Sequence, residues 1–369
     1  MSEVIGRRHL PATIEELSAA WFTEALSERC PGVSVLDARV VDLIRGASTK
    51  IRFELTYRPA SGPVPPTRMI AKGGFGDHSR LRAEMHLHEA LAYRNFVPTL
   101  SVRTPDCYVA HVDEQGRAMV LIEDLALSNS RFLTLQEPIG YEQAEAFLAV
   151  LAGIHARWWN APELADPNVF GERALISVGV GYLLDNTERL LAPEMFAEYM
   201  VLPRGAATPR VLRDGERLRA GLRRLAEFQR RAGVTVNHGD ALLGNLYLTA
   251  QGEPGFLDWQ PNKGPWSQDI SYFLTSALDL PDRRRWETAL LAYYLNTLRE
   301  LGVKAPRFDE AWLLYRRNVL WGFYAWLLNS NAFQSEANNT ANCVRFATAM
   351  IDHDVYGLIE SWDCALARA

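Results

Sequence analysis

The chain has 369 residues, of which 48% are hydrophobic, and this length suits two or three domain-sized units or one two-lobed protein. Its 39 Lys and Arg residues against 44 Asp and Glu residues give a net charge of −5, which excludes a general attraction to nucleic acid or an anionic membrane. The four cysteines are widely spaced, which predicts free thiols. The N-terminus has no apolar stretch, and no segment of roughly 18 apolar residues occurs, so we expect no membrane span. Together these features predict a cytoplasmic setting.

The first third of the chain alternates between β-rich runs and helical patterns. Thr13 and Glu16 form a capping-box pattern, which predicts a helix that begins there and continues to about Cys30. A second helical pattern covers Ser79–Tyr93. Five strand-like runs lie at Val35–Ile44, Lys50–Tyr57, Arg68–Lys72, Cys107–Val112 and Ala118–Glu123. We therefore expect a mostly antiparallel sheet with one inserted helix.

Beyond Asp124 the pattern changes to long amphipathic helices, interrupted by one β-hairpin with strands at Asn245–Leu248 and Gly255–Asp258. Helices are predicted around Phe147–Trp158 and at roughly Arg213–Ala232, Arg284–Glu300, Asp309–Leu328 and Asn339–Glu360. The expected fold class is α+β, with a small antiparallel lobe at residues 1–122, a connecting segment at 123–128 and a larger helical lobe at 129–369.

One region carries the residue types that phosphoryl transfer needs, namely HGDALLGN at residues 238–245 and FLDWQ at residues 256–260. The reaction needs a carboxylate beside the acceptor hydroxyl and oxygen ligands that hold Mg²⁺ on the nucleotide phosphates. Asp240 can supply the first, and Asn245 and Asp258 can supply the second. Asp240 and Asn245 share a loop that closes into the hairpin, and the return strand brings Asp258 beside them. The sequence therefore predicts Asp240 as the catalytic base and Asn245 and Asp258 as metal ligands.

These motifs resemble those of the aminoglycoside phosphotransferase and choline kinase-like family, which has the protein kinase-like fold. The HGD-x4-N loop is similar to the signature loop of that family, and Asp258-Trp259-Gln260 stands where protein kinases carry DFG. In character the chain looks closest to the ecdysteroid kinase-like subgroup. The resemblance covers roughly residues 43–273 and implies a two-lobed kinase that uses ATP and Mg²⁺.

Two backbone segments match nucleotide-binding elements of the resembled family. A loop of glycine and small residues lies between two predicted strands, and its N–H groups can approach phosphate oxygens; it consists of Gly46, Ala47, Ser48 and Thr49. The run after the last strand of the first lobe resembles the family's hinge between lobes. The resemblance implies that backbone groups of Glu123, Asp124 and Leu125 hydrogen-bond the adenine.

Lys72 ends an apolar strand, where its ammonium group can reach the α- and β-phosphates. In the resembled family the lysine pairs with a glutamate on the next helix. Glu84 lies twelve residues on and is the expected partner. Glu89 is the competing candidate, but five residues further along it is expected on a different face of the helix.

Three other polar residues are interpreted as structural. His238 precedes the catalytic pair of residues and is expected to brace the loop rather than to exchange protons. His155 matches a histidine that the family often carries, yet a satisfied core histidine is the favoured interpretation. Asp269 resembles the family's Asp at the start of a helix, where a capping role suffices.

The acceptor is expected to be a small molecule. Protein kinases usually have an arginine before the catalytic Asp, which pairs with a phosphate on the activation loop, and here that residue is Gly239. About ten residues separate Asp258 from the helix near Asp269, without an A-P-E sequence, so no long activation segment can dock a peptide. The sequence therefore disfavours a protein kinase.

The chemical class of the acceptor is less directly indicated. The helix Asp309–Leu328 is rich in aromatic residues, which more often build a core than line a ligand site, but some must line any pocket there and favour an apolar, steroid-like metabolite. An aminoglycoside would want clustered carboxylates, whereas this helix carries Arg316 and Arg317. An antibiotic kinase and a non-catalytic nucleotide-binding module stay as alternatives, and the oligomeric state is not predicted.

Overall fold

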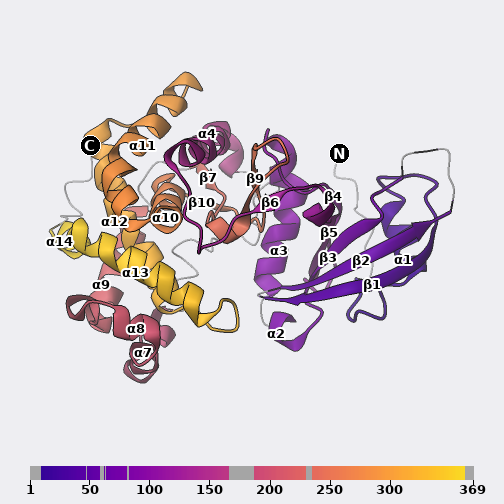
Figure 1. Cartoon of the computed structure of the whole chain (residues 1–369), viewed down its shortest axis with the longest axis horizontal. Coiled ribbons are helices and arrows are strands. Elements are labelled where there is room, and N and C mark those ends of the chain that lie inside the picture. Colours follow the sequence, from indigo (N-terminus) through magenta and orange to yellow (C-terminus); the bar gives the residue numbers. More distant parts are fainter. Residues whose placement is uncertain are drawn as a thin grey trace. The chain divides into compact units, whose positions relative to one another are not determined.

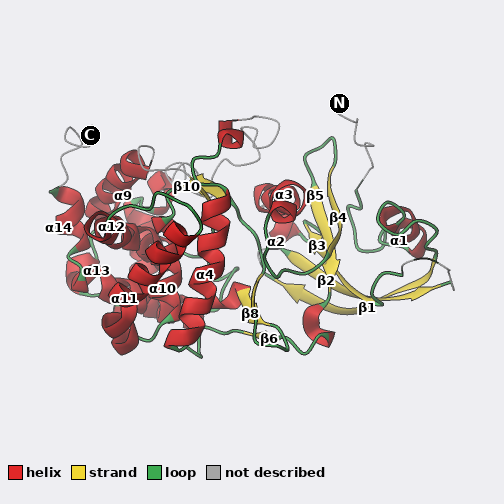
Figure 2. Cartoon of the chain, turned by 90° about the horizontal axis from the view of Figure 1, so that it is seen from above, coloured by secondary structure: helices red, strands yellow, loops and turns green. Residues whose placement is uncertain are grey.

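The structure is a computed structural model that describes residues 10–361, apart from 47, 59–61, 63, 81–82, 166–186 and 230–234. The chain divides into two compact units. Unit 1 comprises residues 1–99 and 103–130, and unit 2 comprises residues 100–102 and 131–369. The colours along the chain separate the two units in Figure 1, and Figure 2 shows that the long strands belong to unit 1 and most helices to unit 2.

Unit 1 is built on an antiparallel five-stranded sheet with the strand order β1-β2-β3-β5-β4. The strands are β1 (Val35–Arg45), β2 (Thr49–Tyr57), β3 (Arg68–Gly73), β4 (Cys107–Val112) and β5 (Ala118–Glu123). Alternate residues of β2 are buried, and Ile51, Phe53 and Leu55 share a core with Phe22 and Leu26 of helix α1 (Ala19–Leu26). The predicted antiparallel sheet is confirmed.

The helices of unit 1 depart from the prediction at their ends. Helix α1 begins at Ala19, where the Ser18 hydroxyl accepts a hydrogen bond from the N–H of Trp21, so the predicted start at Thr13 is wrong. Glu16 accepts a hydrogen bond from the N–H of Ala12 instead, which places the residues of the expected capping box in a turn before the helix. The second helical region is divided into α2 (Asp77–Arg80), α3 (Ala83–Leu91), a π-helical turn η1 (Ala92–Phe96) and a 3₁₀ turn η2 (Val97–Thr99).

Unit 2 is mainly helical, and its central helix is α10 (Ser267–Ala277), in which every residue is buried. The other described helices are α4 (Tyr141–Arg157), α7 (Pro193–Met200), α8 (Pro203–Ala207), α9 (Gly215–Gln229), α11 (Leu280–Glu300), α12 (Phe308–Leu327), α13 (Glu336–Asp352) and α14 (Val355–Glu360). The helix predicted at Asn339–Glu360 is broken at Asp354, whose φ of 46° is left-handed and ends the regular hydrogen bonding. Within the described part of the chain, no helix has the length and apolar character needed to cross a bilayer.

In the described part of unit 2, short strands hold the predicted catalytic loop from both ends. Strands β6 (Arg131–Phe132), β8 (Leu246–Leu248) and β9 (Pro254–Phe256) form one antiparallel sheet in the order β6-β8-β9. Strands β7 (Thr235–Asn237) and β10 (Asn262–Gly264) form an antiparallel pair. The hairpin β8–β9 confirms the sequence prediction, whereas β6, β7 and β10 are too short to show a periodic pattern and were not predicted.

Candidate functional site

Two loops of unit 2 lie side by side because the strands that flank them pair. The first loop, residues 238–245, connects β7 to β8, and the second, residues 257–261, connects β9 to β10. The N–H of Leu257 donates to the carbonyl oxygen of Asn245 at 2.8 Å, and the N–H of Gln260 donates to that of His238 at 3.1 Å. Backbone hydrogen bonds therefore join the two loops directly, and each loop is held by strands at both ends.

Asp240 and Asn245 contact each other across the first loop. The Nδ2 group of Asn245 donates to the carboxylate Oδ2 of Asp240 at 2.8 Å and to its carbonyl oxygen at 2.9 Å. No described residue donates a hydrogen bond to the Oδ1 atom of Asn245. The amide group is thus oriented by Asp240 through its nitrogen, and its oxygen is left available as a ligand.

The second loop brings the charge of Asp258 close to Asp240. The pKa of Asp240 is raised to about 7, mainly by burial; the hydrogen bond from Asn245 opposes this rise, and the charge of Asp258 contributes to it. Asp258 has a φ of 53°, a left-handed backbone conformation that residues other than glycine rarely adopt. Such backbone strain concentrates at functional sites. The three residues predicted for chemistry are therefore brought together in unit 2.

Gly239 is required by the way the two loops approach. Its φ is +89°, and a Cβ atom built on it would lie 1.9 Å from the carbonyl oxygen of Gln260. Any side chain at this position would therefore force the loops apart. The lack of an arginine before Asp240 has a direct steric reason.

Asp269 anchors the first loop from helix α10. Its carboxylate accepts hydrogen bonds from the N–H groups of His238 at 2.6 Å and Gly239 at 3.0 Å. The prediction that Asp269 caps its own helix is wrong, since the carboxylate is turned toward the loop. His155 lies against the same carboxylate, with Nε2 at 3.4 Å from Asp269 and Nδ1 at 2.7 Å from the hydroxyl of Tyr294. This agrees with the interpretation of His155 as a satisfied core histidine.

His238 braces both loops. Its Nε2 atom is 3.0 Å from the carbonyl oxygen of Leu257, and its Nδ1 atom accepts a hydrogen bond from the N–H of Asp240 at 3.3 Å. Burial lowers the pKa of His238 to about 4, so the ring is neutral near pH 7 and donates from Nε2. The structural role predicted for His238 fits these contacts.

Tyr272 is a site residue that the sequence did not single out. It lies three residues after Asp269 on α10, so both side chains point toward the same loop. Its hydroxyl hydrogen-bonds the carboxylate of Asp240, which works against the effect of burial by lowering the pKa of Asp240. The spacing of Asp269 and Tyr272 on one helix face was the signal available in the sequence.

The lysine predicted to bind phosphate lies in unit 1 and pairs with Glu89. The Nζ atom of Lys72 lies 2.7 Å from the Oε1 atom of Glu89, and the two side chains are 4% and 3% exposed. Glu84 is exposed, in the first turn of α3. The predicted pairing of Lys72 with Glu84 is therefore wrong, because the face of α3 that packs against the sheet carries Glu89.

A model of the ecdysteroid kinase-like family matches residues 81–305, which is more than half of the chain. The chain belongs to the ecdysteroid kinase-like family. A search of curated proteins found no match.

Several solved structures are similar to this family member over most of their length. An ethanolamine kinase from Plasmodium vivax has a TM-score of 0.52 at 12% identity, covering 85% of this chain and 81% of that one. A choline kinase from Cryptosporidium parvum has a TM-score of 0.52 at 11% identity, covering 93% and 99%. A putative aminoglycoside phosphotransferase from Ralstonia eutropha has a TM-score of 0.50 at 12% identity, covering 93% and 97%. At these identities the likeness shows the fold, which is the protein kinase-like fold.

In this ecdysteroid kinase-like chain, the loop at residues 46–49 is braced by its own side chains. The hydroxyl of Ser48 lies 3.3 Å from Nδ1 of His86, and the hydroxyl of Thr49 lies 2.8 Å from that of Ser79. The N–H of Gly46 donates to the carbonyl oxygen of Ser48 at 3.2 Å, and Ala47 lies outside the described residues. The two hydroxyl groups therefore hold the turn, and phosphate contacts here stay a prediction for the backbone.

The run Glu123–Leu125 follows β5. The N–H of Glu123 donates to the carbonyl oxygen of Asp106 at 2.9 Å. The N–H of Asp124 donates to the carbonyl oxygen of Arg68 at 3.4 Å. The carboxylate of Asp124 is buried, pairs with Arg52 and caps the 3₁₀ turn η3 (Leu125–Leu127) through the N–H of Ala126. The N–H of Leu125 begins that turn, and adenine contacts along this run stay a prediction.

The oxygen atoms near Asp240 fit a magnesium ion that is shared with a nucleotide. Mg²⁺ is usually held by one or two carboxylates together with water and substrate phosphates. The Oδ1 atom of Asn245 and the carboxylate of Asp258 stay the predicted ligands of this kind. Within the described ranges, no three His, Cys, Asp or Glu side chains are grouped to hold a metal. Two oxygen ligands would leave further coordination positions for phosphates and water.

Proposed function

We propose that this protein transfers the γ-phosphoryl group of ATP to a hydroxyl group of a small molecule. The observation that carries the proposal is the grouping of Asp240, Asn245 and Asp258 on two joined loops of unit 2. This grouping supplies a carboxylate for the acceptor and two oxygen ligands for the metal, which is what phosphoryl transfer requires. Membership of a kinase-like family supports the same reaction class.

Asp240 is the proposed catalytic base. With a pKa of about 7, a large fraction of its carboxylate is ionised near neutral pH and still basic enough to accept a proton. It would take the proton of the acceptor hydroxyl as the new bond from oxygen to the γ-phosphorus forms and the bond to the β-phosphate oxygen breaks. Asn245 and Tyr272 hold the carboxylate in position from two sides.

Asn245 and Asp258 are the proposed metal ligands, and they would hold Mg²⁺, which supplies charge neutralisation at the phosphates. The hydrogen bond from Asn245 to Asp240 orients one of the two proposed ligands before the nucleotide binds. Preorganised groups of this kind stabilise developing charge without a cost of rearrangement.

Unit 1 supplies the proposed nucleotide contacts. Lys72, oriented by Glu89, offers its ammonium group to the α- and β-phosphates. Backbone N–H groups of residues 46–49 are proposed for the phosphates and the N–H of Leu125 for the adenine. The three described cysteines, Cys30, Cys107 and Cys343, are free thiols, which supports the cytoplasm as the proposed setting.

The proposed acceptor is a hydroxylated apolar metabolite. Tyr272 hydrogen-bonds Asp240 and lies close to Trp326 on α12, so one aromatic side chain borders the proposed base and a second lies next to the first. The argument from Arg317 against an aminoglycoside loses its force, because this side chain is buried and its Nε group donates to the carbonyl oxygen of Leu358. Support for an apolar acceptor therefore comes from the aromatic surroundings of Asp240.

The test is phosphorylation of a panel of hydroxysteroids, other hydroxylated apolar molecules, choline, aminoglycosides and a generic protein, with products identified by mass spectrometry. We expect Mg²⁺-dependent phosphorylation of at least one apolar alcohol and none of the protein. Nucleotide binding without any phosphorylated product would instead identify a non-catalytic nucleotide-binding module. Selective phosphorylation of an aminoglycoside would overturn the proposed acceptor class.

A further inference from the structure

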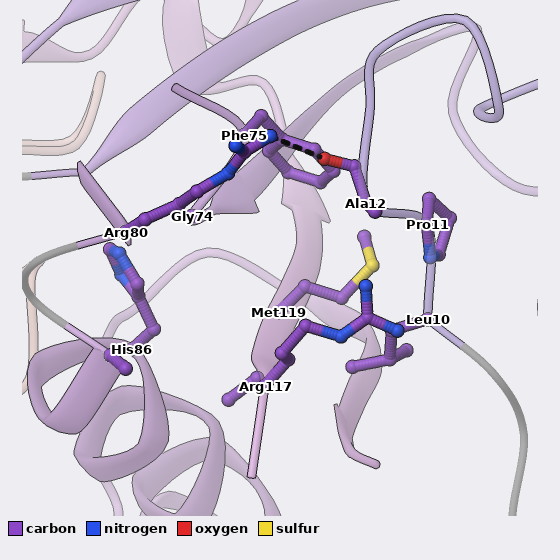
Figure 3. Close-up of a pocket in the computed structure, with 11 residues that line it drawn as sticks. Leu10, Pro11, Ala12, Gly74, Phe75, Arg80, His86, Arg117 and Met119 are labelled. Atoms are coloured by element: carbon purple, nitrogen blue, oxygen red, sulfur yellow. Dashed lines mark hydrogen bonds between the residues drawn. The ribbon is translucent and has the colours of Figure 1, made fainter. Parts of the chain in front are cut away.

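Unit 1 contains a pocket of about 260 Å³ that has no role in the proposed phosphoryl transfer. Its walls come from the segment before α1, the end of β3, helices α2 and α3, and the hairpin β4–β5 (Figure 3). Apolar side chains dominate the wall, with Leu10, Pro11, Phe75 and Met119 among them. An apolar cavity of about 150 Å³ holds a benzene molecule, so this pocket has room for about ten non-hydrogen atoms.

Arg80 supplies a positive charge that a ligand can use. In Figure 3 its guanidinium group points toward the carbonyl oxygen of Ala12, at 3.4 Å, which is the long limit of a hydrogen bond. Its ion pair with Asp77 is 3.2 Å long, and the Asp77 side chain is 99% exposed. An exposed pair of this kind contributes little, so a ligand carboxylate can take the place of Asp77.

The rest of the wall favours an anionic group over a cationic one. Among the described residues that line the pocket, none is acidic. Arg117 also lines it, but its guanidinium group is held by Asp113 at 2.7 Å. In Figure 3 this guanidinium group lies beside Leu10, and its ion pair with Asp113 makes it a weaker partner for a ligand than Arg80.

One wall of the pocket belongs to the helix that orients Lys72. His86 of α3 lines the pocket and lies 3.3 Å from the hydroxyl of Ser48 in the proposed phosphate loop. Glu89, three residues further along α3, holds Lys72. A ligand that contacts Ala83 and His86 therefore acts on the same helix as the proposed phosphate-binding residues.

We propose that this pocket binds a small apolar molecule that carries a carboxylate, and that its occupancy tightens nucleotide binding through α3. The apolar part packs against Phe75 and Met119, and the carboxylate binds the guanidinium group of Arg80. The ligand bridges α3 and the β4–β5 hairpin and so stabilises the position in which Glu89 holds Lys72. The coupling rests on the proposed function, whereas the binding site does not.

Calorimetric titration of the full chain with octanoate tests the site, since this probe has an apolar chain of the right size and one carboxylate. We expect saturable binding that Arg80→Gln weakens about fivefold, the upper end for an exposed ion pair. The same variant should leave binding of the neutral analogue 1-octanol unchanged. Ala83→Trp places an indole at an exposed position of the wall and should abolish binding of both probes.

Arg58→Gln is the matched control, because Arg58 is an exposed arginine of unit 1 outside the pocket. It should bind octanoate as the wild type does. Absence of octanoate binding to the wild type would overturn the site. Binding that neither Arg80→Gln nor Ala83→Trp changes would place the probe elsewhere and would overturn it equally.

The coupling is measured as the affinity for a nonhydrolysable ATP analogue with and without saturating octanoate. We expect severalfold tighter binding in the wild type and no change in Ala83→Trp, and by reciprocity the analogue should tighten octanoate by the same factor. An unchanged affinity in the wild type would overturn the coupling. If the analogue does not bind at all, the proposed function fails, while the octanoate titration still decides the pocket.

Discussion

Removing Glu89 tests whether it, rather than Glu84, holds Lys72. In Glu89→Ala the ammonium group of Lys72 stays in a position that is 4% exposed, and its carboxylate partner at 2.7 Å is lost. Breaking a buried ion pair by deleting one partner costs about 3–5 kcal/mol, because the remaining buried charge loses the carboxylate that offset it. We expect unit 1 to lose stability by an amount in this range.

The matched control is Glu84→Ala, which changes the same residue type on the same helix at an exposed position. Its cost should stay within about 0.5 kcal/mol. Urea unfolding gives the free energies, and hydrogen exchange in peptides from β3 and α3 assigns the loss to unit 1.

A double substitution separates stability from function at the same pair. Replacing a buried ion pair by apolar residues of similar size is often neutral, so Lys72→Met with Glu89→Leu should recover most of the stability that Glu89→Ala loses. The double variant should still bind the ATP analogue poorly, because no ammonium group remains for the phosphates. A large loss of stability in Glu84→Ala, with little effect in Glu89→Ala, would refute this reasoning.

Three further predictions concern the loops of unit 2. Gly239→Ala should destabilise the chain by about 3 kcal/mol or more in urea unfolding, because residue 239 has a left-handed backbone and its new Cβ would clash with Gln260. The control Gly252→Ala also has a left-handed backbone, with a φ of +81°, but nothing lies within 4 Å of its new Cβ, so it should cost about 1 kcal/mol. Tyr272→Phe removes a hydrogen bond that lowers the pKa of Asp240, so this pKa should rise above about 7. The acidic limb of the pH–rate profile should then move to higher pH, and an unmoved limb would contradict the contact. Asp269→Asn should lower the free energy of unfolding by about 1–3 kcal/mol, because an amide oxygen replaces the charged acceptor of two loop N–H groups. The control Asp279→Asn, at an exposed position, should change it by less than about 0.5 kcal/mol.

The parts of the fold with long periodic patterns could be predicted from the sequence. Strands such as β4 (Cys107–Val112) and β5 (Ala118–Glu123) begin and end at the predicted residues, because turn residues at Asp113–Gly116 bound two apolar runs. The short strands β7 and β10 carry three residues each and are defined by their pairing partner, which is distant in sequence. Local pattern cannot reveal a strand of that kind.

The site shows the same division between local and tertiary information. Asp240 and Asn245 could be identified because their spacing places them on one loop, and the hairpin return indicated Asp258. The prediction of Glu84 as the partner of Lys72 is wrong, since both candidates lie on the same helix and the packing of α3 against the sheet selects Glu89. The spacing of Asp269 and Tyr272 places them on one face of α10, but their contacts with the loop depend on the position of that helix, which is tertiary information.

The central claim is that Asp240 serves as the base in phosphoryl transfer from ATP, and Asp240→Asn tests it most directly. The substitution keeps the size of the side chain and removes only its ability to accept a proton as a carboxylate. With an acceptor from the panel, we expect the single-turnover rate to fall about 10²- to 10⁴-fold, while the affinity for Mg²⁺ and the ATP analogue stays within a few-fold of the wild type. A rate that is undiminished in Asp240→Asn would contradict the account.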